Sequence, residues 1–158
     1  MDRGDLARQL VGYNGWANDR ILTAAGRLPG ADVTGAGASF GSVIGTLAHI
    51  YDAEFGWHER WMARPDPPDA EFADIDAATA ALRKTQVTLE SYVAGWADGD
   101  WDDPCTFGNT RPRTYARGPM LVHVVNHSTF HRGEAALLLT SAGCSPGDLD
   151  FLDYIEGA

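Results

Sequence analysis

The sequence has few cysteines, almost no lysine and no long hydrophobic run. Its two cysteines, Cys105 and Cys144, lack the close spacing of a metal site and are too few for a disulfide framework. No signal-peptide pattern opens the chain, and no apolar stretch reaches the length needed to cross a bilayer. These absences predict a cytoplasmic protein with reduced thiols and no membrane-spanning segment.

Positive charge is also scarce. The formal net charge is −10, Lys84 is the single lysine, and the arginines are scattered except for Arg111, Arg113 and Arg117. A nucleic-acid-binding protein normally carries a basic stripe that neutralises phosphates. We therefore expect no direct nucleic-acid partner, and we interpret the acidity as a property that keeps the exposed faces soluble.

The composition that remains is typical of a globular protein. A length of 158 residues with 44% hydrophobic content predicts a single domain, residues 1–158, that can bury a core without disulfides. Apolar residues recur every three or four positions, which predicts an all-α fold, a four-helix bundle with one further short helix. The expected helices cover residues 6–28, 42–63, 74–96, 119–141 and 148–155. The Pro- and Gly-rich segment 101–117 predicts a long loop or a short hairpin that turns at Gly108-Asn109.

Local signals refine these helices. Pro29-Gly30 is expected to end the first helix, and Asp74 is expected to cap the third. Gly12 and Gly15 interrupt the first helix and indicate the close approach of a neighbouring helix. The predicted apolar stripe of the second helix contains Ile44, Leu47, Tyr51, Phe55 and His58.

Three of the five histidines, His123, His127 and His131, lie four residues apart near the end of the chain. Residues four apart are neighbours on one face of a helix, and imidazoles paired in this way bind zinc and other transition metals. His127 and His131 are therefore a candidate metal pair, and the alternative is two hydrogen-bonded polar residues on a core helix. A straight helix does not bring three such rings to one point, so we assign His123 to the wall of a pocket.

A tight metal site needs a third ligand. His58 belongs to the apolar stripe of its helix, so we expect a structural role for it at the edge of the core. His49 lies nearly opposite that stripe among small residues, which argues against an ordinary core histidine. Periodicity alone does not bring His49 to the last long helix. Glu134, one turn beyond His131, is a candidate ligand, proton acceptor or hydrogen-bond partner of a ligand.

Several other chemistries are excluded by spacing. A zincin protease needs Glu directly after the first helical histidine, where this chain has Ser128. A di-iron bundle needs Glu-x-x-His on two helices, and the interval from Glu54 to His58 is one residue too long. The sequence contains no phosphate-binding Walker loop, dinucleotide fingerprint or nucleophile elbow.

Three segments and the tail of the chain resemble the DinB/YfiT-like superfamily of metal-binding four-helix bundles. They are Tyr13-Asn-Gly-Trp16-Ala-Asn18, Leu47-Ala-His49-Ile50 with Glu54 and Trp57, His123-Val-Val-Asn-His127 with His131-Arg132-Gly133, and Ser145-Pro-Gly-Asp148-Leu-Asp150-Phe-Leu-Asp-Tyr154. The resemblance implies a metal triad of His49, His127 and His131 that holds zinc or nickel, and iron(II) would also suit imidazole ligands. It further implies up-down-down-up topology and a homodimer. The position of Glu134 is often Gln in that superfamily.

The resemblance also implies a function, because several members are thiol-dependent transferases or isomerases. We therefore expect a metal-dependent thiol S-transferase or thiol-dependent isomerase that acts on small electrophiles in detoxification or a stress response. In this interpretation a low-molecular-weight thiol is the co-substrate, and His123 or Glu134 accepts a proton. Arg111, Arg113 and Arg117 would bind carboxylates of the thiol or, alternatively, form a solvated loop. The alternative functions are a metal-dependent hydrolase and a non-catalytic metal-binding stress protein.

Overall fold

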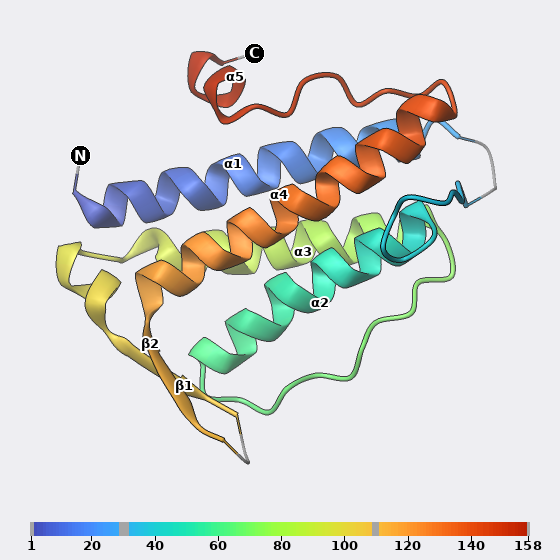
Figure 1. The fold of residues 1–158 in the computed structure, drawn as a ribbon. Helices are drawn as coiled ribbons and strands as arrows, with labels where there is room; N and C mark the ends of the chain where they lie inside the picture. The colour runs from blue at the N-terminus through green and yellow to red at the C-terminus, as the bar shows by residue number, and fades with distance from the viewer. Residues whose placement is uncertain (1, 29–31, 109–110, 158) are drawn as a thin grey trace.

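The computed structural model describes residues 2–28, 32–108 and 111–157, and it is predominantly helical, as the periodicity predicted (Figure 1). In chain order, its elements are α1 (Arg3–Ala25), α2 (Val43–Trp61), α3 (Ile75–Ala94), the 3-10 helix η1 (Asp98–Asp102), β1 (Pro104–Phe107), β2 (Arg113–Ala116), α4 (Arg117–Ser141) and α5 (Phe151–Glu156). Within the described residues, no helix combines the length and the apolar character needed to span a membrane.

The ends of the helices follow the local sequence. Asp74 caps α3 as predicted, because its side chain accepts a hydrogen bond from the backbone N–H of Ala77 at 2.8 Å. Helix α1 ends at Ala25, before the expected position, and its C-cap is Gly26, a residue that disfavours helix. Pro29-Gly30, the expected end signal, lies outside the described residues.

The four long helices lie side by side, with α1 and α4 running in one direction and α2 and α3 in the other (Figure 1). Helix α4 packs against both α1 and α2, and α3 closes the other side against the same two helices. The short α5 returns along α1, where Gly12 lies against the Tyr154 hydroxyl. Gly15 lies against the Gln86 side chain of α3, so both glycines mark close approaches, as predicted.

The buried face of α2 differs from the predicted apolar stripe. Ile44, Tyr51 and Phe55 are only partly buried. Leu47 and His58 of the predicted stripe are buried, together with the large side chains of Val43, Ile50, Glu54, Trp57 and Trp61. The prediction was wrong for Ile44, Tyr51 and Phe55, because the fully buried Glu54 lies at the centre of this face and a stripe traced through apolar residues passes beside it.

A short antiparallel hairpin precedes α4, in the segment where a hairpin or a loop was expected. Residue Pro104 of β1 lies opposite Ala116 of β2, and Phe107 lies opposite Arg113. Gly108 follows β1 with a φ of 90°, in the left-handed region that favours glycine. The other expected turn residue, Asn109, lies outside the described residues.

Candidate metal centre

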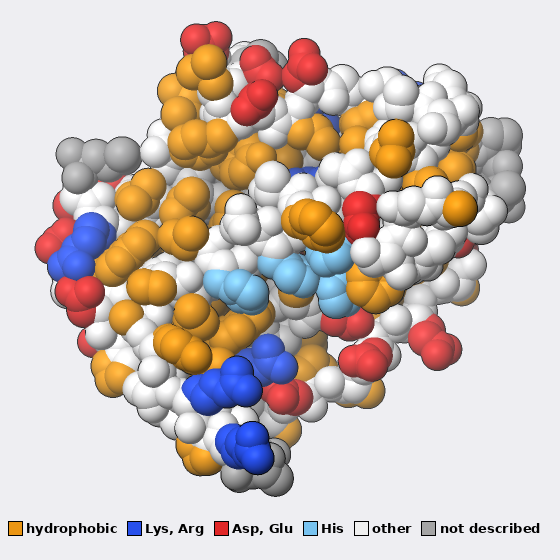
Figure 2. Space-filling view, in the orientation of Figure 1, with side chains coloured by type: hydrophobic (Ala, Val, Ile, Leu, Met, Phe, Trp, Pro, Cys, Tyr) orange, Lys and Arg blue, Asp and Glu red, His pale blue; other side chains and the backbone are white. Residues whose placement is uncertain are grey.

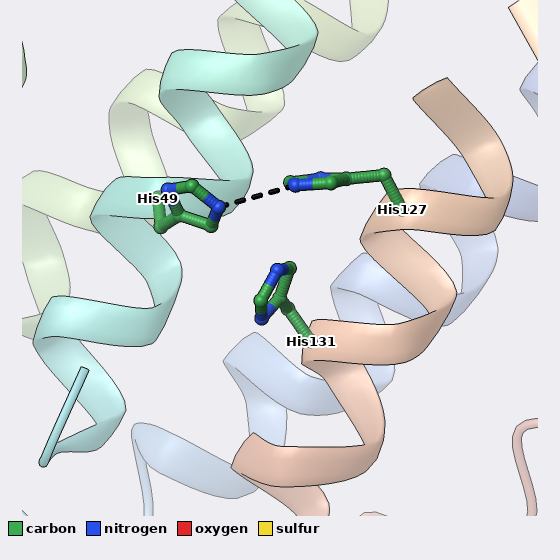
Figure 3. Close-up of side chains that lie close together, drawn as sticks. All are labelled: His49, His127 and His131. Atoms are coloured by element: carbon green, nitrogen blue, oxygen red, sulfur yellow. Dashed lines mark hydrogen bonds between the residues drawn. The ribbon is translucent and has the colours of Figure 1, made fainter. Parts of the chain in front are cut away.

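Three histidines meet where an edge of α2 faces an edge of α4 (Figure 3). Each residue of an α-helix is rotated by about 100° around the helix axis from the residue before it. His49 follows Val43 by six residues, so it lies about 120° around the axis from Val43, which is on the buried face of α2. The same interval separates His127 from the buried Leu121 on α4. The two helices run in opposite directions and pack together, so these flanking positions meet at the rim of the core. Packing thus brings His49 to the last long helix, which periodicity could not do.

The ring nitrogens of the triad converge. The Nε2 atoms of His49 and His127 are 3.1 Å apart, and one ligand atom from each of the three rings lies within 4.8 Å of the others. In a tetrahedral zinc site, bonds of about 2.0–2.1 Å separate the ligand nitrogens by about 3.3 Å. The three imidazoles are therefore spaced so that they could hold one metal ion. The donor set suits zinc, nickel or iron(II).

The electrostatics of the site favour neutral imidazoles. Burial, together with the neighbouring rings of His131 and His49, lowers the pKa of His127 to about 4. Burial is also the main cause that lowers the pKa of His49. Both rings therefore carry a free nitrogen lone pair at neutral pH, and a lone pair is what a metal ligand must supply.

Glu134 connects a triad histidine to the segment before α2. Its Oε2 lies 2.7 Å from His131 Nδ1, and its Oε1 accepts hydrogen bonds from the Ser39 hydroxyl at 2.6 Å and the Ser39 N–H at 3.1 Å. Burial raises the pKa of Glu134, but the hydrogen bonds from Ser39 and His131 outweigh it and lower the pKa below its usual value. A carboxylate that accepts from Nδ1–H leaves the Nε2 lone pair of His131 free for a metal.

Phe40, the residue after Ser39, covers one side of the triad. Its ring stacks on His49 at a centroid distance of 4.0 Å and meets the edge of His131 at 5.5 Å. The segment 39–40 is thus attached to the histidines by both an aromatic stack and the Glu134 hydrogen bonds. Sequence analysis did not identify Phe40, because this contact depends on how the segment before α2 folds back over the helix.

His123 lies beside the triad but not within it. Its exposed ring is 5.9 Å from that of His127 and 5.7 Å from that of Trp57, between ring centroids. Figure 2 shows the histidines as one stripe across this face, with Lys and Arg side chains gathered below it over the hairpin. His58 is buried away from the triad, with Nδ1 3.0 Å from Glu59 Oε1.

The three arginines of segment 101–117 lie on the hairpin and at the start of α4. Arg111 and Arg113 are exposed on the hairpin. Arg117, at the start of α4, lies with Nη1 3.5 Å from Asp103 Oδ2.

A fully buried polar network lies behind the site, and sequence analysis missed it. Glu54 Oε1 accepts hydrogen bonds from the side-chain amides of Asn14 and Asn18, at 2.7 and 2.9 Å. The Ser128 hydroxyl donates a third, at 2.8 Å. The amide oxygens of both asparagines accept from Arg132 Nη1, at 2.6 and 2.9 Å. Ser128 and Arg132 each follow a triad histidine in the chain, so the network fixes the rotation of α4 that turns those histidines toward α2. The sequence signal for this network was the presence of two charged residues, Glu54 and Arg132, inside the quoted motifs.

A groove of about 600 Å³ runs along α2 from the triad. Phe40 and His49 line one end, and Trp57 and Arg60 line the other. The floor contains small residues, and the segment after α2 forms the far wall. This volume lies within the range of small-molecule binding sites.

Comparison with known proteins agrees with the resemblance seen in the sequence. The model of the DinB family matches residues 1–158. Protein DinB of Bacillus subtilis (strain 168) is 26% identical over 162 residues, an alignment that covers 96% of this chain and 94% of the relative. The family match therefore includes the positions of all three triad histidines.

Proposed function

This chain belongs to the DinB family, and we propose that it is a metal-dependent thiol S-transferase, or thiol-dependent isomerase, that acts on small electrophiles. The observation that carries the proposal is the approach of His49 Nε2 to His127 Nε2, 3.1 Å apart beside His131 at the end of a groove. Three imidazole ligands add no negative charge of their own, so they suit a site in which an anionic sulfur completes the ligand set.

The residues of the site take distinct roles in this proposal. A divalent zinc, nickel or iron ion held by the triad would lower the pKa of a small thiol, so that the thiolate is present at neutral pH. In the transfer, the sulfur forms a bond to an electrophilic carbon, and the leaving group departs with its electron pair. His123, exposed beside His127, accepts the proton that the thiol loses. Glu134 orients His131, because both of its oxygens are already engaged.

Other parts of the proposal concern partners and assembly. Arg111 and Arg113, which lie on the hairpin, would bind carboxylates of the thiol co-substrate. Arg117 is close to Asp103 instead. We also infer that residues 1–158 form one domain and that α1–α4 are the up-down-down-up bundle of the superfamily. A homodimer and a cytoplasmic location stay predictions.

Metal content tests the site itself. We expect about one equivalent of zinc, nickel or iron in the wild-type protein purified without added metal, because three converging imidazoles form a metal site. The His127→Ala variant should lose the metal. The control variant His123→Ala, which changes a nearby exposed histidine outside the triad, should retain it. A wild-type protein that neither contains nor takes up a divalent ion would overturn the metal centre.

Thiol dependence tests the chemistry. The metal-loaded protein is incubated with 1-chloro-2,4-dinitrobenzene and, one at a time, glutathione, cysteine and 2-aminoethanethiol. Turnover that requires both metal and thiol supports the transferase. Ester hydrolysis without thiol would indicate a hydrolase, and metal binding with neither activity would indicate a non-catalytic metal-binding protein.

A further inference from the structure

The groove beside the triad carries an unusual combination of side chains for a binding site. Carboxylates of Asp52, Asp66 and Asp69 line it, and Arg60 is the single arginine or lysine among its described lining. Three carboxylates against one guanidinium leave two negative charges in excess. Aromatic rings lie at both ends, so the groove offers anionic and aromatic surfaces together.

One cation already occupies part of this groove. The guanidinium carbon of Arg60 lies 5.1 Å from the centroid of the Trp57 ring, and Arg60 Nε donates to Asp66 Oδ1 at 2.8 Å. A cation held between an aromatic face and a carboxylate is the arrangement by which proteins recognise organic cations. Arg60 shows that the walls of the groove provide this environment.

The other two carboxylates have no such partner. Among the described residues, no Arg, Lys or His forms an ion pair with Asp52 or Asp69. Asp52 accepts one hydrogen bond, from the Ala70 N–H at 2.9 Å. Burial and the charge of Asp69 together raise the pKa of Asp52. A cation bound between them would stabilise both carboxylates in their charged form.

The position of this pair relates it to the triad. Asp52 follows His49 by three residues on α2, so the two side chains are neighbours on the helix surface. Phe40, which stacks on His49, lines the end of the groove next to the triad, and Glu134 holds its segment in place through Ser39. A molecule that reaches the triad along the groove therefore passes Asp52 and Asp69.

We propose that the groove binds a small molecule with a protonated amino group, which Asp52 and Asp69 hold while its reactive end faces the triad. The identity of the reactive end, a thiol, rests on the proposed function, whereas the amine site does not. Arg111, Arg113 and Arg117 are absent from the described lining of the groove, so a carboxylate on the same molecule would have to extend toward the hairpin.

The amine site is tested on metal-free protein with three probes of similar shape. These are 2-phenylethylamine, 2-phenylethanol and 3-phenylpropionate, titrated while the NMR signals of the protein are followed. We expect the amine to bind about fivefold more tightly than the alcohol, and the carboxylate to bind most weakly. Equal affinities, or a preference for the carboxylate, would overturn the proposal.

Matched variants locate the effect. In the double variant Asp52→Asn with Asp69→Asn, the amide oxygen introduced on α2 can still accept the Ala70 hydrogen bond, so we expect loss of the amine preference with unchanged binding of the alcohol. The double variant Asp148→Asn with Asp150→Asn, at two exposed carboxylates, controls for the same change in net charge and should retain the preference. A preference that survives in the double variant would place the amine elsewhere and contradict the inference.

A second arm separates this inference from the proposed function. Cobalt(II)-loaded protein is titrated with 2-aminoethanethiol and with 3-mercaptopropionate, and the sulfur-to-cobalt absorption band reports thiolate binding. Tighter binding of the aminothiol, lost in the double variant, supports both proposals. Amine binding in the metal-free protein without any thiolate band would retain the groove and reject thiol chemistry. Thiolate binding without amine preference would retain the thiol chemistry and reject the groove.

Discussion

The Tyr92 hydroxyl is a buried polar group without a hydrogen-bond partner among the described residues. Burial raises the pKa of Tyr92 to about 12, and Cys105 and Asp103 add to the effect while Arg117 opposes it. An unfolded tyrosine titrates near pH 10. The unfolded chain therefore releases this proton first, so the stability that Tyr92 contributes is complete below pH 10 and is lost as the pH rises toward 12.

Replacement of Tyr92 by phenylalanine should consequently change little at pH 7, since the hydroxyl makes no bond that would be lost. The fall in the melting temperature between pH 10 and 12 should be shallower in the variant than in the wild type. Thermal unfolding followed by circular dichroism at several pH values measures this. Parallel alkaline profiles would show that Tyr92 is not the group responsible.

Glu134 lies 2.7 Å from His131 Nδ1, on the side of the ring away from the nitrogen proposed to bind a metal. Glu134→Ala removes the acceptor for His131 Nδ1 and releases Ser39, so we expect about a 10–100-fold loss of metal affinity, typical of such a partner. Glu134→Gln keeps an oxygen acceptor and should lose less. Competition with a chromogenic chelator measures the affinities, and the exposed Glu156→Ala is the control. An unchanged affinity in Glu134→Ala would remove Glu134 from the site.

At the scale of the elements, the network around Glu54 joins α1, α2 and α4 through buried polar groups. Burial lowers the pKa of Arg132, and the charge of Glu54 partly offsets this. Removal of one member of such a charged pair leaves the other uncompensated in the core, at a cost of about 3–5 kcal/mol. Each of the two asparagine amides donates a hydrogen bond to Glu54 and accepts one from Arg132, so the amides connect the two charges.

We therefore predict that Glu54→Gln lowers the free energy of unfolding by about 3 kcal/mol. The double variant with Arg132→Gln should be less destabilised than the sum of the two single variants, because it leaves no isolated charge. Urea unfolding of the four proteins measures the coupling. Strictly additive losses would mean that the two charges act independently and that the asparagines do not connect them.

For the whole molecule, the triad joins the second and the last long helix, which are far apart in sequence. A metal that binds only the folded protein stabilises it by about 4 kcal/mol at a concentration a thousand times the Kd. For a chain of this length, that corresponds to a melting temperature about 10 °C higher.

We expect this increase for the wild type and for His123→Ala when zinc or nickel is added, but not for His49→Ala. Differential scanning calorimetry with and without a chelator measures it. A full shift in His49→Ala would show that α4 alone binds the metal and that α2 contributes nothing.

Much of the molecule follows from local sequence. The long helices lie close to their expected positions because periodicity and caps such as Asp74 act over a few residues. The pairing of His127 with His131 was likewise visible, since a helix alone places residues four apart on one face. The end of α1 was misplaced by one turn, because Gly26 stops the helix before the stronger signal expected to end it.

The third member of the triad needed tertiary structure. The rotation of α2 is set by what its buried face meets, and that face includes Glu54, whose partners come from α1 and α4. Counting apolar residues cannot foresee a carboxylate stabilised by groups distant in sequence. The contacts of Phe40, the attachment of Glu134 to Ser39 and the acidic groove depend in the same way on segments that fold against each other. Local sequence was enough for the helices and for two histidines of the triad, whereas packing brought the third histidine to them and formed the groove beside the site.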